Sequence, residues 1–260
     1  MNNIQVKVLG EFGAPAGTMM FLARLTQRGH KIKNMDELVS EYVECIGKEF
    51  SSAGNVARLP HGTIKRFTPI TVAIVGASRR FLAQARTHSI GLDFVSASLQ
   101  YSDYSDSNSF VVPYELIKID SNKETPQAVP SYLAACEEAM KTYKFMVDSG
   151  VNNDTAGYVA PQSLRNILVI TGNHEAWCSF LNKRLCNRNT DETKYVAALI
   201  WKALQGTQDA ETMFKYVGPD CMYGACREGF MSCCDPVPRT ITSAQEFINI
   251  YWPLLNKERE

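Results

Sequence analysis

The order of apolar and polar positions along the chain predicts a mixture of short strands and longer helices. Strand-like alternation or β-branched runs occur in four segments, namely Ile4–Val8, Ile70–Val75, Val95–Ser102 and Ser163–Thr171. Helical spacing and capping residues predict six helices, over residues 17–29, 35–50, 79–88, 131–147, 174–186 and 191–205. Strands and helices do not alternate regularly enough for a doubly wound parallel sheet, so the pattern predicts an α+β fold.

Three polar or glycine-containing segments are predicted to connect these elements without regular structure. They are Gly54–Thr63, residues 102–109 and residues 150–156. From Gly218 onward the chain is rich in Cys, Gly and Pro. We therefore expect one domain over residues 1–217 and a Cys-rich extension over residues 218–260 that packs on the same domain.

Composition narrows the possible partners. Apolar residues make up 45% of the 260 residues and charged residues 21%, which is typical of a folded protein. The 27 basic and 27 acidic residues cancel, so no overall basic field is available for nucleic acid. No apolar run reaches the roughly 20 residues of a transmembrane helix, and the N-terminus does not resemble a secretory signal. We expect a cytoplasmic protein that binds neither membranes nor nucleic acid.

Half of the eight cysteines lie close together in the tail, at Cys221, Cys226, Cys233 and Cys234. Their spacing differs from the paired C-x2-C motifs of zinc ribbons, and four histidines leave little room for a histidine-rich metal centre. A disulfide, a metal site and reduced structural thiols all remain possible. We expect reduced thiols and no metal, because nothing in the sequence indicates an oxidising compartment.

Two cationic segments are candidates for binding an anion. Residues 79–89 contain three arginines and His88 without any acidic residue, which suits a phosphate group. A solvated helix whose arginines pair with distant acids is the alternative. The second segment, Asn182–Arg188, contains Lys183 and Arg184, but Asp191 and Glu192 follow closely and also allow a salt-bridged surface helix.

A strand face of small polar side chains is a third candidate. Ser96, Ser98 and Gln100 would share this face and could hydrogen-bond a nucleotide, although serines on an edge strand are often simply solvated. The chain contains neither a dinucleotide-binding glycine motif nor a P-loop. None of these features identifies a protein family by itself, but their order along the chain is informative.

Four blocks, taken in order, resemble the flavin-dependent thymidylate synthases. The segment around His61 and Thr63 is similar to the family's Gly-His-x-Ser-x-x-Glu-His motif. Residues 70–84 resemble its strand, Gly-x-Ser-Arg turn and glutamine-bearing helix, and residues 98–101 resemble its Ser-x-Arg-Tyr segment. The strongest block, residues 156–192, includes an asparagine turn, Phe-Leu-x-x-Arg and Cys-Asn-Arg.

The resemblance implies a central, mostly antiparallel sheet with flanking helices and a homotetramer with FAD at subunit interfaces. It implies reductive methylation of dUMP to dTMP with methylenetetrahydrofolate and NADPH as co-substrates. Arg184 matches the arginine that contacts and activates the pyrimidine, an electrostatic catalytic role. The positions implied to bind the cofactor are Thr63, Arg86, His88, Asn173, His174, Glu175 and Arg188. The positions implied to bind the substrate are Gln84, Ser96, Ser98, Gln100 and Arg184.

Several positions depart from the family pattern. Thr87 and Ser89 flank His88 where the family has arginines, and Gln100 and Gly157 also stand where arginines are expected. Arg66 replaces a glutamate and Phe67 a histidine. Each lost charged hydrogen bond would cost about 1.5–3 kcal/mol of nucleotide affinity. These departures keep two alternatives open: a family member that methylates or hydroxymethylates C5 of another pyrimidine nucleotide, and a non-catalytic nucleotide-binding homologue.

Overall fold

The computed structural model describes residues 1, 3–59, 62–88 and 90–255. Its strands are β1 (Gln5–Glu11), β2 (Pro69–Ser78), β3 (Leu92–Ser96) and β4 (Arg165–Asn173). The first helices are α1 (Pro15–Arg28), α2 (Met35–Ile46), α3 (Ala53–Arg58), α4 (Arg79–Arg86), α5 (Tyr114–Ser121) and α6 (Ala128–Asp148). The remaining α-helices are α7 (Asn153–Ala156), α8 (His174–Arg184), α9 (Asp191–Leu204), α10 (Ala210–Met213) and α11 (Ala244–Tyr251). Short 3-10 turns include η2 (Gly62–Lys65), η4 (Asp220–Met222) and η5 (Gly229–Met231).

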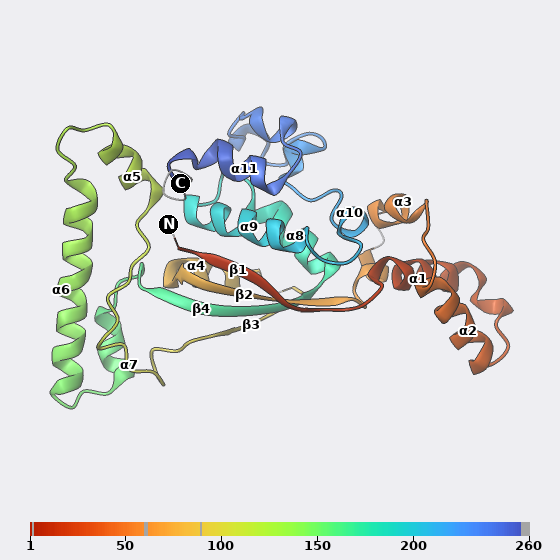
Figure 1. The fold of residues 1–260 in the computed structure, drawn as a ribbon, viewed down its shortest axis with the longest axis horizontal. Helices are drawn as coiled ribbons and strands as arrows, with labels where there is room; N and C mark the ends of the chain where they lie inside the picture. The colour runs from red at the N-terminus through yellow and green to blue at the C-terminus, as the bar shows by residue number, and fades with distance from the viewer. Residues whose placement is uncertain (2, 60–61, 89, 256–260) are drawn as a thin grey trace.

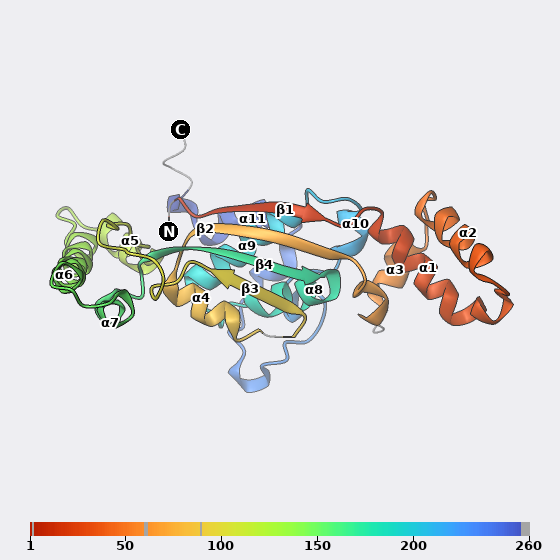
Figure 2. The same ribbon diagram turned by 90° about the horizontal axis from the view of Figure 1, so that it is seen from below.

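The four strands form one sheet in the order β1-β2-β4-β3, and every neighbouring pair is antiparallel. Helices α4, α8 and α9 cover one face, and α11 lies on α9 as an outer layer (Figure 1). Helices α1–α3 extend from one end of the sheet and α5–α7 from the other (Figures 1 and 2). The predicted α+β fold with an antiparallel sheet is confirmed.

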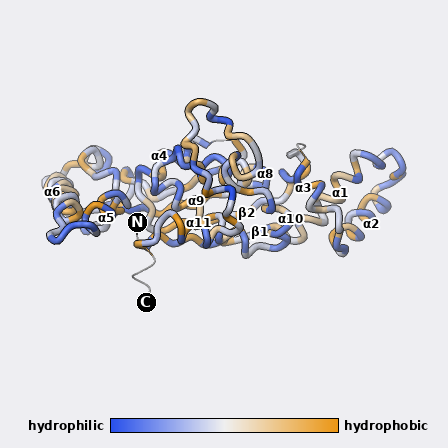
Figure 3. The backbone as a smooth tube through the Cα atoms, turned by 90° about the horizontal axis from the view of Figure 1, so that it is seen from above, coloured by the Kyte–Doolittle hydropathy of each residue, from blue (hydrophilic) through white to orange (hydrophobic). Residues whose placement is uncertain are grey.

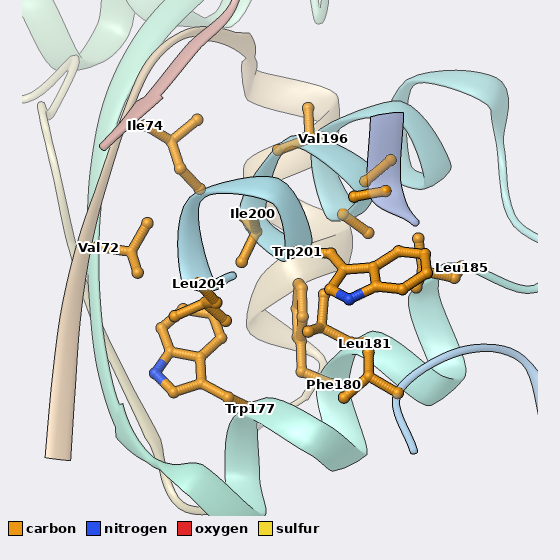
Figure 4. Packing of buried hydrophobic residues seen from close by; sticks show 14 of the residues in the cluster. Val72, Ile74, Trp177, Phe180, Leu181, Leu185, Val196, Ile200, Trp201 and Leu204 are labelled. Carbon is orange, nitrogen blue, oxygen red and sulfur yellow. The ribbon is translucent and has the colours of Figure 1, made fainter. Parts of the chain in front are cut away.

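The core lies between the covered sheet face and α8 and α9. Val72 and Ile74 of β2 point toward Ile200 and Leu204 of α9 (Figure 4). Trp177 and its neighbours on α8 complete this layer, since alternate residues of a strand and every third or fourth residue of a helix share one face (Figure 4). Figure 3 shows the same alternation of hydrophobic and hydrophilic stretches along the outlying helices α1, α2 and α6.

The opposite face of the sheet is left uncovered (Figure 2). It presents three large apolar side chains to solvent: Val75 of β2, Val95 of β3 and Ile167 of β4. Val75 and Ile167 are direct cross-strand partners, so the exposed apolar surface is continuous across the two central strands. Contiguous exposed apolar surface of this kind commonly marks a protein interface.

A bulge in β2 corrects the predicted end of that strand. The strand continues to Ser78 instead of stopping at Gly76, and its register with β4 shifts between Val75 and Ala77. Gly76 has φ +85°, a conformation that L side chains rarely adopt, and its carbonyl accepts a hydrogen bond from Arg165 Nη1 at 2.6 Å. Ser78 then caps α4 by accepting from the backbone N–H of Phe81 at 3.0 Å.

The prediction of a strand over Val95–Ser102 was wrong in its extent. Strand β3 covers Leu92–Ser96, and the chain then turns. The Ser98 hydroxyl accepts from the backbone N–H of Gln100 at 3.1 Å, and the Ser102 N–H bonds back to the Ser98 carbonyl. Beyond Ser96, the backbone N–H of Gln100 therefore bonds to the nearby Ser98 hydroxyl and not to a neighbouring strand.

Two segments predicted as connections contain helices, and three further α-helices were not predicted. Helix α3 begins one residue before the expected loop Gly54–Thr63 and occupies its first half, and α7 lies within the expected linker 150–156, where Asn152 caps it. Helices α5, α10 and α11 had no counterpart among the sequence-based predictions. Among the described helices, none combines the length and hydrophobicity that crossing a bilayer requires. The division of the chain at residue 217 stays a prediction.

Candidate active site

A cleft of about 670 Å³ lies beside α8, bounded by α3, α10 and the Cys-rich tail. Six of its lining side chains are cationic and three are acidic. The cationic residues are Arg58, Lys65, Lys183, Arg184, Arg188 and Arg227, and the acidic residues are Glu175, Asp220 and Glu228. The cleft therefore carries an excess of positive charge in a protein whose overall formal charge is zero.

Helix α8 places the key side chains of the cleft. Asn173 caps it by accepting from the backbone N–H of Ala176 at 2.9 Å. The buried face carries Trp177, Phe180 and Leu181 into the core (Figure 4). Glu175 begins the exposed face and Arg184 ends it, as the helix dipole favours at each terminus.

Two of the acidic residues already pair with cations. Lys65 Nζ lies 2.7 Å from Glu175 Oε2, and Arg227 Nε lies 3.2 Å from Asp220 Oδ2. Lys183, Arg184 and Arg188 have no carboxylate within ion-pair distance among the described residues. The pairing with Asp191 or Glu192 that would have made this a salt-bridged surface helix is not formed there. These three cations are free to meet an anionic ligand.

Arg184 is the most tightly positioned of these cations. Its Nη2 donates to the Gln84 carbonyl at 2.9 Å and to Thr87 Oγ1 at 2.7 Å, which joins α8 to the end of α4. Its Nε is buried without a hydrogen-bond partner among the described residues, and burial lowers the pKa of its guanidinium. A fixed, partly desolvated guanidinium that lacks a carboxylate is arranged to stabilise negative charge on a bound molecule.

His88 lies behind this arginine and is buried. Its ring meets Phe180 edge to face at a centroid distance of 5.5 Å. Burial, and then the charges of Lys183 and Arg184, lower its pKa to about 4. His88 is therefore neutral at pH 7.

His174 is fully buried and does not reach the cleft. Its Nδ1 donates to the Thr68 carbonyl at 2.8 Å, and its ring stacks on Phe214. The His174 side chain therefore holds the segment between η2 and β2 from the interior of the protein. The resemblance instead implies that this side chain contacts the cofactor. The neighbouring Glu175 does line the cleft, whereas Asn173 uses its side-chain oxygen as the helix cap.

The predicted substrate-binding positions other than Arg184 lie around α4 and β3, outside this cleft. Gln84 Oε1 accepts hydrogen bonds from Thr190 and Thr193 at the start of α9. Arg86 donates to Ser96 Oγ at 2.9 Å. Ser98 and Gln100 form the turn after β3.

The structure thus divides the predicted site residues into two groups. Glu175, Arg184 and Arg188 share the cleft. Thr63 lies exposed on η2. The α4–β3 group, which is Gln84, Arg86, Ser96, Ser98 and Gln100, is joined to the cleft by the hydrogen bonds of Arg184 to Gln84 and Thr87. His61 and Ser89 lie outside the described residues.

Sequence reasoning missed several lining residues. Lys65 and Arg58 were not singled out, and Cys221, Arg227 and Glu228 bring the tail to the rim of the cleft. The only sequence signal for Lys65 is its position two residues after Thr63 in a motif block. No local pattern reveals that a tail segment folds back onto α8.

Acid is expected to destabilise the fold through His174. Its pKa is about 4 in the folded protein, mainly because of burial, against an ordinary value of 6.5. Between these values the unfolded chain binds more protons, so the free energy of unfolding falls as the pH decreases from about 6.5 to 4. The full contribution is about 3 kcal/mol. Urea unfolding at pH 7, 6 and 5 measures it. His174→Gln should make the dependence less steep without abolishing it, because His88 has a similarly lowered pKa, and an unchanged pH slope in this variant would contradict the assignment.

Comparison with known proteins identifies the family. A family model described as thymidylate synthase complementing protein matches residues 7–207. A flavin-dependent thymidylate synthase from Geobacter sulfurreducens is 28% identical over 179 residues, covering 68% of this chain and 73% of the relative. One from Clostridium tetani is 24% identical over 247 residues, covering 88% of this chain and 93% of the relative.

Solved structures show the same fold. A UMP/dUMP methylase, PolB, from Streptomyces cacaoi bound with 5-Br dUMP has a TM-score of 0.65 at 19% identity, covering 84% of this chain and 97% of that chain. Thymidylate synthase X from Helicobacter pylori with FAD and dUMP has a TM-score of 0.58 at 15% identity, covering 80% and 95%. The family match spans well over half of the sequence and includes β2, β3, β4 and most of β1. It confirms the resemblance to the flavin-dependent thymidylate synthases, and the chain belongs to the thymidylate synthase complementing protein family.

Proposed function

We propose that this protein is a FAD-dependent enzyme that reductively methylates dUMP to dTMP, with methylenetetrahydrofolate and NADPH as co-substrates. The observation that carries the proposal is Arg184, a partly buried guanidinium in a cationic cleft with no carboxylate partner among the described residues. The named activity of the relatives and the FAD and dUMP in the Helicobacter pylori structure support it.

The residues of the cleft fit an anionic cofactor and an anionic substrate. Lys183 and Arg188 offer exposed charge for phosphate groups, and Arg184 offers a buried Nε that has no partner. FAD carries a diphosphate and dUMP a monophosphate, and both match such a donor set. Reduced flavin, when bound, supplies the hydride of the reaction.

The chain's own contribution is to bind, orient and polarise. Arg184 stabilises negative charge that develops on the pyrimidine ring, because its position is held by Gln84 and Thr87 and needs little rearrangement. Glu175, which is paired with Lys65, places a negative charge in the lining of the same cleft. His88 is neutral at pH 7 and so does not act as an imidazolium acid; its ring packs against Phe180 of α8.

We further propose a homotetramer, as the resemblance implies. The uncovered sheet face with Val75, Val95 and Ile167 is an apolar surface suited to a second copy of the chain. A site completed by a partner subunit would also explain why the α4–β3 group lies outside the cleft of one subunit.

A second candidate is a family member that modifies C5 of another pyrimidine nucleotide. At Gly157, where the family has an arginine, a built Cβ would lie 3.3 Å from two atoms of Leu99. A long side chain there requires Leu99 to move, so this chain is shaped for a different contact with the nucleotide. Gln100, in the turn after β3, likewise offers no charge to a phosphate.

Flavin absorbance and NADPH oxidation test both candidates. The purified protein should show a flavin band close to stoichiometric with the chain after FAD is added. A synthase should then oxidise NADPH only when dUMP is present and should rescue a thymidine-requiring strain. Oxidation that depends on UMP or dCMP instead, without rescue, would favour the second candidate. A protein that stays colourless after incubation with excess FAD and removal of the free FAD would refute both candidates.

A further inference from the structure

The side-chain amide of Gln84 is held by the start of α9. Thr190 Oγ1 donates to Gln84 Oε1 at 3.0 Å, and the Thr193 hydroxyl donates to the same oxygen. Thr190 caps α9 and Thr193 lies three residues later, a spacing that puts both hydroxyls on one face of the helix. An amide oxygen has two lone pairs, so the two threonines satisfy it completely.

The backbone of Gln84 is fixed as well. Its carbonyl accepts from Arg184 Nη2 at 2.9 Å and from Thr87 Oγ1 at 2.8 Å. Gln84 is therefore tied to α9 through its side chain and to α8 through its backbone. Its amide group is held directly beside the residue that fixes the guanidinium of Arg184.

Burial of Thr193 determines which way the amide points. Thr193 is fully buried, and its hydroxyl donates to no atom of the described residues other than Gln84 Oε1. The opposite orientation of the amide would take this acceptor away, and a buried donor without an acceptor is costly. The amide nitrogen Nε2 of Gln84 donates to no described residue, and Gln84 is half-buried. The amide can therefore offer a ligand only N–H donors.

Packing alone gives no reason for this polar contact. Helix α4 is already anchored to α9 at its first residue, because Ser78 donates its backbone N–H to Glu192 Oε1 at 2.7 Å. Apolar side chains in place of Gln84 and Thr193 would join the two helices about as well, since replacing both partners of a hydrogen bond by apolar groups is nearly neutral. The contact has a reason if Gln84 must present a fixed donor.

We propose that Thr190 and Thr193 are positioning residues, which fix Gln84 Nε2 as a hydrogen-bond donor to an acceptor oxygen of the bound pyrimidine nucleotide. The inference rests on the proposed function, in which Gln84 contacts the substrate, and adds which atom of the amide meets the ligand and what holds it there. A pyrimidine carbonyl, a ribose oxygen and a phosphate oxygen are all suitable acceptors. The two threonines act through Gln84 and do not touch the ligand.

Calorimetric binding of dUMP to the FAD-loaded protein tests the proposal. Thr193→Val keeps the shape of the side chain but removes the hydroxyl, so the Kd for dUMP should rise by about 5- to 10-fold. Thr193→Ser restores the hydroxyl and should bind dUMP within about 2-fold of wild type. Thr142→Val is the matched control, because it removes an exposed threonine hydroxyl that bonds within α6, and it should bind like wild type.

Variants of Gln84 separate positioning from packing. In a Gln84→Ala background, Thr193→Val should weaken dUMP binding no further, because its effect passes through the amide. Gln84→Glu keeps an acceptor for both threonines but loses the N–H donors, so the Kd should rise by about 10-fold or more. This variant leaves Thr193 in place and decides the question if Thr193→Val does not fold.

Deoxyuridine, which lacks the phosphate, identifies the acceptor. A loss in Gln84→Glu that persists with deoxyuridine assigns the acceptor to the base or ribose, and a loss seen only with dUMP assigns it to the phosphate. Unchanged dUMP binding in Thr193→Val, or losses that add up in the double variant, would overturn the role of the threonines while the proposed function stands. Wild-type protein that binds FAD but no pyrimidine nucleotide would overturn the proposed function and this inference with it.

Discussion

The Arg184→Ala variant is expected to lose about 1,000-fold or more in turnover while it remains folded. Removing a single preorganised donor to developing negative charge typically costs 100- to 1,000-fold. Arg184 supplies a full charge and has no carboxylate that shares it among the described residues. The loss should appear mainly in kcat, because stabilisation needed only in the transition state affects kcat more than KM.

Two further variants separate catalysis from structure. Arg184→Lys keeps the charge but not the planar fork that spans Gln84 and Thr87, so partial activity is expected. Lys202→Ala removes a cation from the last turn of α9, outside the cleft, and should leave turnover unchanged. Full activity in Arg184→Ala, with a normal circular dichroism spectrum and melting temperature, would refute the assignment of this residue.

The largest stability effect is expected at Trp177. Its side chain is fully buried between the sheet and α9, and its Nε1 donates to the Ile70 carbonyl at 3.1 Å (Figure 4). Replacement by alanine leaves a large cavity and removes the hydrogen bond to Ile70, at a cost of about 3–5 kcal/mol. Equilibrium unfolding in urea measures the change.

The controls at Trp177 distinguish packing from hydrogen bonding. Trp177→Phe keeps an aromatic ring and loses the N–H, so the cost should fall to about 1–3 kcal/mol. Tyr158→Ala changes a side chain that is 90% exposed and should leave the unfolding midpoint nearly unchanged. An Ala variant at 177 as stable as wild type would mean that this layer of the core does not hold the fold together.

The central elements were predictable because their sequence periodicity and their tertiary environment agree. Helices α8 and α9 and strands β2 and β4 each bury one regular set of apolar side chains, as at Val72 and Ile74, and β1 partly buries Val6 and Val8. The failures occurred where a polar side chain set the local structure. Ser98 ended a strand whose alternation continued, and Asn152 started a helix inside a segment expected to be a linker.

The site was predictable only in part. The order of the motif blocks predicted Glu175, Arg184 and Arg188 as site residues, and all three line the cleft. Sequence could not show that Gln84 is occupied by Thr190 and Thr193, because that contact depends on how α4 and α9 pack. It also gave no link between Cys186 and the tail cysteines, which tertiary contacts alone create.

The hydrophobic interior is divided into two separate clusters. The smaller one joins α6 and α7 to the loop before α5 and contains Tyr143, Met140 and Phe110, whereas the main one lies under the sheet. Because the two interiors share no buried residue, we expect them to unfold as two separate cooperative units. Amide hydrogens of α6 should therefore exchange through openings that leave the sheet intact, and this end of the molecule can unfold and refold while the cleft beside α8 keeps its shape.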